Sequence, residues 1–284
     1  MFRRPFPIAN PARRNRARRA PSLVVAALLA LALVACSSDD PEYVEQSVED
    51  LYNSGMNDLQ VNRYAAAAKS FDEVERQHPY SFWATRAQLM AAYAYYQDNS
   101  YDDAVLAAER FIRLHPGNRD VDYAYYLIAI SYYEQISDVS RDQKMTEDAV
   151  DALTELVRRF PDTEYARDAR LKLDLTYDHL AGKEMTIGRY YLRRKQYLAA
   201  IKRFQTVIEG FQTTSHVPEA LHRLTEAYLA LGVTDEAQAT AAVLGYNYPG
   251  SAWYRDSYAL LTGQDLAPAD SERSWISRAW KAVF

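Results

Sequence analysis

The feature that most constrains this sequence is an alanine that recurs with a proline at a fixed distance. The pairs, each twelve residues apart, are Ala67 and Pro79, Ala104 and Pro116, Ala149 and Pro161, Ala200 and Gln212, and Ala237 and Pro249. Proline has no N–H and cannot continue a helix, so each pair predicts a helix that ends at a set distance beyond its alanine. Only Gln212 breaks the pattern. We therefore expect a series of similar helical units.

Two further columns keep the same register. Side chains that can cap a helix follow two residues after each proline position: Ser81, Asn118, Thr163, Thr214 and Ser251. Small residues stand eight after the same positions: Ala87, Ala124, Ala169, Ala220 and Ser257. A capping side chain predicts the start of the next helix, and small residues suit places where two helix axes approach closely. The columns together predict stacked helix-turn-helix hairpins.

Composition and spacing extend this prediction to most of the chain. The 284 residues are 49% hydrophobic but include only 9 glycines and 11 prolines, which argues against a turn-rich β-sandwich or barrel. Successive key alanines lie 37, 45, 51 and 37 residues apart, which places insertions around Ser137–Thr146 and Lys183–Gln196. We predict an all-α protein, an α-solenoid of about five helix-turn-helix repeats over residues 42–263.

The first residues of the chain have the order of a bacterial export signal. Seven arginines and no acidic residue stand in residues 1–35, and Ser22–Ala35 carries no charge. As a helix this uncharged run would extend about 21 Å, too short for a hydrocarbon core of roughly 30 Å. It ends in Leu33-Val34-Ala35-Cys36, which resembles the lipobox of bacterial lipoproteins. We expect a signal peptide over residues 1–35.

The same resemblance gives Cys36 a role. In lipoproteins this cysteine is acylated and becomes the mature N-terminus, so Cys36 is the predicted membrane anchor and residues 36–41 a lipidated tether. Ser37 follows it rather than aspartate, which implies export to the outer membrane, on its periplasmic side. The alternative is an ordinary signal peptide in which the cysteine is coincidental.

Charge and motifs exclude several classes of function. Without its first 35 residues the chain has a formal net charge of −12, against −5 for the whole, and such a body repels nucleic acid. A single cysteine excludes a disulfide framework and a cysteine-based zinc cluster. No zinc-protease, serine-hydrolase or nucleotide-binding motif is present, and the five histidines are dispersed. We expect no enzymatic activity, no metal and no cofactor.

The repeat resembles the tetratricopeptide repeat, in which a small residue, a bulky residue and a proline recur on a unit of about 34 residues. Five strings carry a closer resemblance: Asp122–Leu127 (DYAYYL), Arg141–Gln143 (RDQ), Gly188–Tyr191 (GRYY), Ala200–Phe204 (AIKRF) and Asn247–Tyr254 (NYPGSAWY). With the lipobox and five repeats, their order is similar to that of the BamD family, lipoproteins of the outer-membrane β-barrel assembly (BAM) machine. That resemblance implies a scaffold that docks on the periplasmic domains of BamA, meets other BAM lipoproteins and receives unfolded outer-membrane proteins.

The resemblance also implies a partner-binding surface. The arginine that matches Arg203 belongs, in the family, to the surface that meets BamA, so Arg203 is the first candidate for an interface ion pair. Arg189, Arg193 and Arg194 lie in the fourth-repeat insertion, and a local basic patch in an acidic body suits an acidic partner loop. The alternative for Arg203 is an arginine that only meets solvent.

Aromatic side chains of the first two repeats are candidates for a substrate groove. The set comprises Tyr64, Phe71, Tyr80, Phe82, Tyr95 and Tyr101. By the family resemblance they line the half that receives substrate. The alternative for each is packing inside the solenoid.

The C-terminal residues predict an amphipathic helix after a linker, over residues 264–284. Trp275, Ile276, Trp280 and Phe284 recur at helical spacing and share one apolar stripe. Such a helix can cap the last repeat, or it can dock into another subunit or a lipid interface, and the sequence leaves both alternatives open.

Two functions are compatible with these observations. The first is the barrel-assembly scaffold implied by the resemblance. The second is a periplasmic tetratricopeptide scaffold for envelope division or secretin assembly, which would also carry a signal and similar repeats. The lipobox followed by five repeats favours the first.

Overall fold

The computed structural model describes residues 45–269 and 274–281. Cys36 and Phe284, and the tether and signal peptide, lie outside the described residues. Contacts divide the chain into Met1–Glu45 and Gln46–Phe284, and all described helices belong to the second unit. None of the helices in this part of the chain combines the length and apolarity needed to span a bilayer.

The described residues form twelve helices and no strand. They are α2 (Val48–Gln60), α3 (Tyr64–Gln77), α4 (Phe82–Gln97), α5 (Tyr101–Leu114), α6 (Val121–Glu134), α7 (Lys144–Arg159), α8 (Glu164–Arg193), α9 (Tyr197–Gly210), α10 (Val217–Leu231), α11 (Thr234–Asn247), α12 (Ala252–Thr262) and α13 (Trp275–Lys281).

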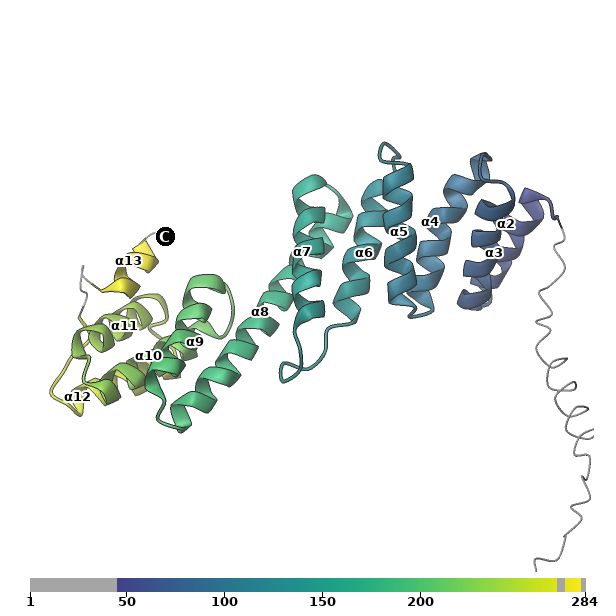
Figure 1. Ribbon diagram of the computed structural model, residues 1–284. Coiled ribbons are helices and arrows are strands. Elements are labelled where there is room, and N and C mark those ends of the chain that lie inside the picture. The colour runs from purple at the N-terminus through teal and green to yellow at the C-terminus, as the bar shows by residue number, and fades with distance from the viewer. Residues whose placement is uncertain (1–44, 270–273, 282–284) are drawn as a thin grey trace, which may run out of the picture. The chain divides into compact units, whose positions relative to one another are not determined.

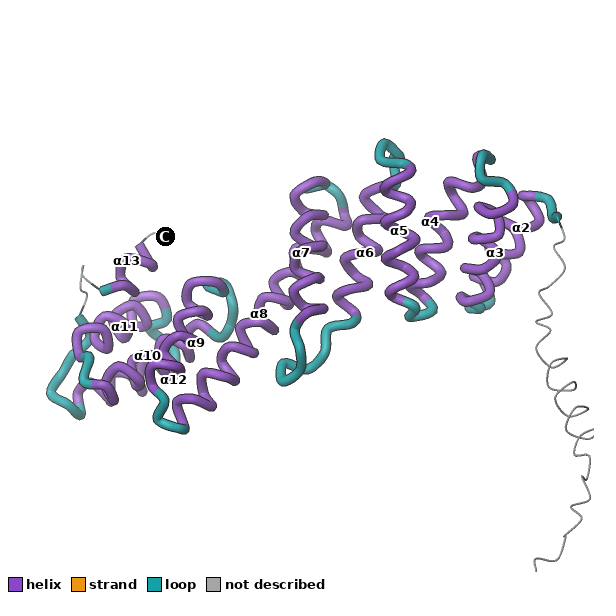
Figure 2. Tube along the Cα trace, in the orientation of Figure 1, coloured by secondary structure: helices purple, strands orange, loops and turns teal. Residues whose placement is uncertain are grey.

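The helices stack as pairs in sequence order (Figures 1 and 2). Each helix from α2 to α11 packs on the next, and the first helices of successive pairs, α2, α4, α6, α8 and α10, also contact one another. Helix α12 packs on α10 and α11, and α13 packs on α11. The predicted all-α solenoid of about five repeats is confirmed, with α12 and α13 added at its end.

The predicted register is visible in the core. Each of the five key alanines, on α3, α5, α7, α9 and α11, is fully buried. Four residues after two of them, Phe71 and Phe204 are also fully buried, each against a glycine of the preceding helix. A Cβ on Gly55 would lie 2.7 Å from the Phe71 ring, and one on Gly188 would meet the Phe204 ring in the same way. Two large rings therefore fit only because the facing residue has no side chain.

In four of the five helix pairs, the two helices are joined by the same tight turn. The turn residue has a positive φ in each case: 60° at Asn62, 61° at Asn99, 59° at Lys195 and 75° at Gly232. The next N–H donates to a carbonyl five residues back, as in Arg63 to Asp58 at 2.8 Å and Val233 to Tyr228 at 2.9 Å. This Schellman arrangement satisfies the last carbonyls of the first helix.

Helix starts follow the capping column in three repeats out of five. The hydroxyls of Ser81, Thr163 and Ser251 each accept a hydrogen bond from the backbone N–H three residues on, at 3.0, 3.2 and 3.1 Å. The prediction is wrong for the other two. Helix α6 begins after Asp120, because the Asn118 side chain instead accepts from the Asp120 N–H in a turn. Helix α10 begins after His216, with Pro218 in its first turn, and the Thr214 hydroxyl donates to the Phe211 carbonyl.

The two insertions take different forms. The first is a loop before α7, held by the Gln143 side-chain amide, which donates to the carbonyls of Asp138 and Arg141 at 3.3 and 3.0 Å. The second adds no loop, because α8 continues through it to a length of 30 residues. Lys183 on α8 donates to the Arg141 carbonyl at 2.9 Å, so the helix also supports the loop.

Candidate partner-binding site

Helix α9 places Arg203 beside a carboxylate of α8. One guanidinium nitrogen, Nη1, lies 3.2 Å from Oε1 and 3.0 Å from Oε2 of Glu184. The Arg203 side chain is 41% exposed and that of Glu184 is 18% exposed. Arg203 is therefore already paired within the chain, yet it keeps enough exposure to contact a second carboxylate.

Arg189 belongs to a separate network between α8 and α10. Its Nη1 lies 2.8 Å from Glu219, and Arg223 bridges that carboxylate at 3.5 Å to Glu226 at 2.9 Å. The Arg223 guanidinium also lies 5.3 Å above the Trp253 ring. The network is therefore a chain of alternating charges rather than an unpaired basic patch.

The structure does not bring Arg203 and Arg189 together. Arg203 meets Glu184 of α8, whereas Arg189 is itself on α8 and pairs with Glu219 of α10. Arg189 lies five positions beyond Glu184 along the helix, a rotation of about 140°. Arg193 lines a hollow of about 210 Å³ with Arg189 and Arg223. Arg194 ends α8, exposed, with its guanidinium 4.9 Å from the Tyr190 ring centre. Three of the candidate arginines thus cluster at the end of α8, and Arg203 lies on another side.

The aromatic candidates for a substrate groove do not share one surface. Tyr64 and Tyr101 donate to the turn residues Asn62 and Asn99 at 2.7 and 2.9 Å, at the start of α3 and α5. These hydroxyls therefore hold tight turns between helices.

In the turn between α3 and α4, Tyr80 is fully exposed, and at the start of α4 Phe82 is 74% exposed, with Arg86 5.4 Å above the Phe82 ring. Tyr95 donates to Asp72 at 2.5 Å across α3 and α4. Phe71 is fully buried in the core, so the groove interpretation is wrong for this residue. Its ring fills the space that Gly55 leaves open.

Sequence reasoning missed a tyrosine face on the first helices of the repeats. Its members are Tyr93, Tyr96, Tyr123, Tyr126 and Tyr165, on α4, α6 and α8. The Tyr165 ring centre lies 5.2 Å from that of Tyr123 and 5.1 Å from that of Tyr126. The sequence signal that could have revealed this face is a pair of tyrosines three residues apart, Tyr93 and Tyr96 on one helix and Tyr123 and Tyr126 on another. The two helices occupy the same place in their repeats.

Burial shapes the chemistry of the tyrosine face. It raises the pKa of Tyr123, and the neighbouring tyrosines add to the rise. It also raises the pKa of Tyr126, whose hydroxyl donates to Asp168 at 2.7 Å. Lys172 completes this group through an ion pair with Asp168 at 2.8 Å. The face therefore presents neutral rings with hydroxyl groups beside a paired charge.

The C-terminal helix α13 packs on the last repeat. Ile276 is fully buried in the same core cluster as α9, α10 and α11, and Trp275 packs against that cluster. The Trp275 indole N–H donates to the Tyr228 hydroxyl at 2.8 Å, and the Ser274 hydroxyl donates to Glu236 at 2.6 Å. The docking interpretation is therefore wrong for Trp275 and Ile276, which form a cap; the Trp280 side chain and Phe284 lie outside the described residues.

The histidines serve packing and helix ends. His78 and His115 are the C-cap residues of α3 and α5, directly before Pro79 and Pro116. His222 is buried with its Nδ1 2.9 Å from the Ser257 hydroxyl, and burial lowers its pKa. Within the described ranges, no group of three histidine, cysteine or acidic residues could hold a metal ion.

A family model described as YfiO, outer membrane lipoprotein, matches residues 44–244 of this chain. The chain belongs to this outer membrane lipoprotein family. The match begins just before α2 and ends within α11, so it covers all five helix pairs almost completely.

Curated relatives agree with the family. An "Outer membrane protein assembly factor BamD" from Caulobacter vibrioides is 53% identical over 254 residues, covering 88% of this chain and 83% of the relative. A protein of the same name from Rickettsia prowazekii is 46% identical over 241 residues, covering 84% and 96%. Among solved structures, the TPR domain of P58(IPK) is 13% identical with a TM-score of 0.40, covering 93% of this chain and 69% of that one.

Membership in the outer membrane lipoprotein family bears on the choice between the two candidate functions. Of the two functions that the sequence left open, it favours the barrel-assembly scaffold over division or secretin assembly.

Proposed function

We propose that this protein is an assembly factor for outer-membrane proteins, a scaffold of the BAM complex. Support comes from the family match over residues 44–244 and from relatives named BamD at 53% and 46% identity over most of the chain. The solenoid suits this role because paired helices present long surfaces that bind other chains.

The proposed location is the outer membrane, with the solenoid on the periplasmic side. The family description supports the outer membrane, and Cys36 in its lipobox supports a lipid anchor. Residues 36–41 then serve as the tether between lipid and solenoid.

The proposed main partner is the set of periplasmic domains of BamA, with other BAM lipoproteins on further surfaces. We place BamA at the edge of α8 and α9 around Arg203. This arginine uses only Nη1 for Glu184, so Nη2 and Nε remain to pair with a partner carboxylate. The cluster of Arg189, Arg193 and Arg194 is the second candidate, for an acidic partner loop.

Charge reversal at Arg203 tests this interface. We expect Arg203→Glu to reduce recovery of the BamA periplasmic domains in co-purification at least tenfold, because it replaces an attraction with repulsion. Lys202→Glu is the matched control: it makes the same charge change at the neighbouring exposed position and should leave recovery unchanged.

The double variant Arg203→Glu/Glu184→Arg separates two roles of Arg203. It restores an ion pair within the chain with the charges exchanged. If Arg203 contacts BamA, the double variant remains defective although its circular dichroism and melting temperature match the wild type. Full recovery of the complex by the exchange would show that the pair is only internal and would contradict the proposed interface.

For unfolded outer-membrane proteins we propose the tyrosine face of α4, α6 and α8, together with the exposed Tyr80 and Phe82. Tyrosine rings give a large apolar contact with little loss of side-chain freedom, and their hydroxyls can bond an extended backbone. The test is photo-crosslinking to an unfolded barrel protein from the position of Tyr123, with the exposed Leu106 of α5 as the control position. Equal crosslinking from both would contradict it.

A further inference from the structure

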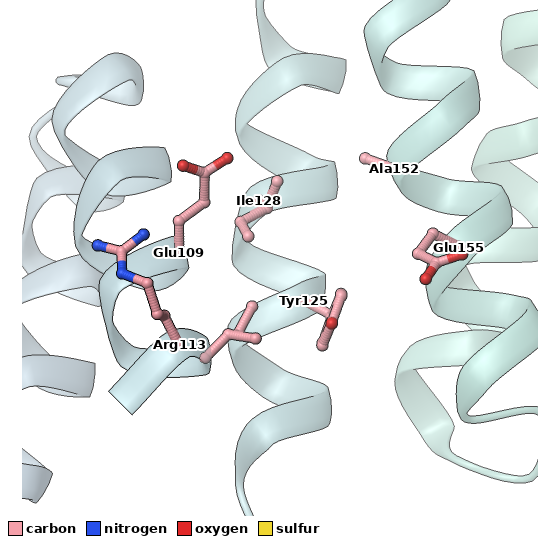
Figure 3. A pocket seen from close by; sticks show the side chains of 7 residues that line it. Glu109, Arg113, Tyr125, Ile128, Ala152 and Glu155 are labelled. Carbon is pink, nitrogen blue, oxygen red and sulfur yellow. The ribbon is translucent and has the colours of Figure 1, made fainter. Parts of the chain in front are cut away.

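Two hollows on the surface of the solenoid differ in the charge of their walls. The groove between α5 and α7, with α6 as its floor, has a volume of about 370 Å³ (Figure 3). Two carboxylates and one guanidinium group line it, those of Glu109, Glu155 and Arg113. The hollow between α8 and α10, of about 210 Å³, is lined instead by three arginines and one glutamate: Arg189, Arg193, Arg223 and Glu226. The walls of this second hollow therefore favour an anion.

The ion pairs around the α8–α10 hollow form a chain of alternating charges that stops short of Arg193. Nη1 of Arg223 lies 2.9 Å from Oε2 of Glu226, and its Nε lies 3.5 Å from Oε1 of Glu219. The other oxygen of Glu219, Oε2, lies 2.8 Å from Nη1 of Arg189. Arg193 lines the same hollow but has no ion pair with any described residue. At this end of the chain a positive group therefore follows a positive group.

The neighbouring sequence supplies no acidic residue to this end. Residues 185–208 carry six basic side chains and no acidic one. Arg189 and Arg193 are four residues apart on α8, so their side chains share one face of the helix, where like charges repel each other. An anion held between the two arginines would remove that repulsion and continue the alternation.

Partial burial strengthens the arginines of this hollow as ligands for an anion. The side chain of Arg189 is 33% exposed, that of Arg223 is 27% exposed and that of Glu219 is 15% exposed. Salt screens such half-buried charges less than it screens fully exposed ones. Arg193 itself is exposed, so an anion can enter from its side of the hollow.

The size and the walls of the hollow suit a carboxylate side chain. Glu219 shows the binding mode within the chain, because each of its two oxygens meets a different arginine. Leu192, which also lines the hollow, offers apolar contact to the methylene groups of a glutamate. A single turn of helix, about 10 Å across and about 5.4 Å long, is larger than the hollow, so only a side chain fits.

We propose that the α8–α10 hollow binds one glutamate side chain of a partner protein, with its two oxygens shared between Arg189 and Arg193. The inference rests on the proposed function, in which the cluster at the end of α8 meets an acidic partner loop, and it gives that loop a definite contact. Arg194 is not part of the site: it does not line the hollow, and its guanidinium lies 4.9 Å from the Tyr190 ring centre.

The test measures thermal unfolding of the full chain, at constant ionic strength, with two blocked peptides. These are acetyl-Ala-Glu-Ala-amide and the same peptide with glutamine in place of glutamate. The first carries a single carboxylate, and the second has the same shape without the charge. A ligand that binds only the folded state raises the melting temperature as it saturates its site. We expect this rise with the glutamate peptide and not with the glutamine peptide.

Two variants locate the response. Arg193→Gln removes one side of the clamp and should raise the half-saturating concentration of the glutamate peptide at least tenfold. Arg167→Gln, the same change at an exposed position on α8, is the matched control and should respond like the wild type. No saturable rise in the wild type, or an equal response in Arg193→Gln, would overturn the proposal. So would inorganic phosphate that saturates at a tenfold lower concentration than the peptide, because the hollow would then be a phosphate site.

The peptide measurement is separate from the test of the proposed BamA interface. If the wild type does not respond to the peptide while Arg203→Glu loses the BamA domains, only the present inference is overturned. If the peptide binds as expected while Arg203→Glu keeps the BamA domains, the carboxylate site is supported and the interface at α8 and α9 is contradicted.

Discussion

The turn residues between paired helices show how single positions carry strain. Asn62, Asn99 and Gly232 are types that accept a positive φ, but Lys195 adopts 59° with a full side chain. A residue with a Cβ in this conformation costs about 1 kcal/mol or more relative to glycine. Lys195 is exposed, so no packing in the described structure offsets that cost.

We therefore expect Lys195→Gly to raise the free energy of unfolding by about 1 kcal/mol. Asn62→Gly is the contrasting variant: asparagine tolerates the conformation, and its side chain accepts from Tyr64 at 2.7 Å, so this change should give no gain. Urea unfolding measures both. A loss of stability in Lys195→Gly would contradict the strain argument.

Buried His222 predicts acid sensitivity. Burial first, and then the charge of Arg223, lower its pKa from the ordinary value of 6.5. The unfolded chain therefore binds a proton before the folded one does. The stabilising contribution is fully present above pH 6.5 and is lost as the pH falls through the lowered pKa of the folded state.

We expect His222→Gln to reduce the difference in unfolding free energy between pH 7.5 and pH 5, compared with the wild type. Glutamine keeps a polar group near the Ser257 hydroxyl but does not titrate. Parallel urea titrations at the two pH values give the comparison. Identical differences in the two proteins would exclude His222 as a source of the acid sensitivity.

Among the elements, α13 has the clearest energetic role. It is only seven residues long, yet it fully buries Ile276 and gives Trp275 a hydrogen-bond partner. So short a helix is not stable alone, and its order depends on this contact. It covers an apolar end that a solenoid must protect from water.

We expect Ile276→Ala to lower the free energy of unfolding by roughly 2–5 kcal/mol, the usual range for this truncation at a buried site. Gln264→Ala, at an exposed position in the preceding turn, should have no measurable effect. Deletion of residues 271–284 should lower the melting temperature. If both Ile276→Ala and the deletion melt like the wild type, α13 is not a cap, and the docking interpretation is favoured instead.

Local chemistry explains which elements could be predicted from the sequence. Proline and capping positions act within a few residues, so the hairpins, the register of the buried alanines and three of the helix starts followed from the pattern. The continuity of α8 did not follow from the pattern. An insertion of helix-forming residues has the same sequence pattern whether it forms a loop or lengthens a helix. Likewise, Arg203 pairs with Glu184 on another helix and Trp275 with Tyr228 across 47 residues, and no spacing within one element encodes such partners.

For the whole molecule, the predicted anchor at Cys36 gives a direct experiment. We expect Cys36→Ser to release the protein from membranes, because the acyl chains contribute about 0.8 kcal/mol for each buried CH2. Fractionation measures the release, and the intact mass of the wild type should match a chain that begins at an acylated Cys36. A wild-type mass that matches the unprocessed chain would contradict the lipoprotein interpretation.

The single long helix α8 also fixes how the repeats after it are rotated relative to the repeats before it. Near its start it holds Asp168 against Tyr126 of α6, and near its end it holds Glu184 against Arg203 of α9. One residue inserted between these points would turn everything after it by about 100°, four residues by about 40°, and seven by only about 20° in the opposite sense. The loop before α7 can change length without such a turn. A change in the length of the loop before α7 therefore does not rotate the later repeats. Within α8, by contrast, only insertions that nearly complete whole turns keep the later repeats in place.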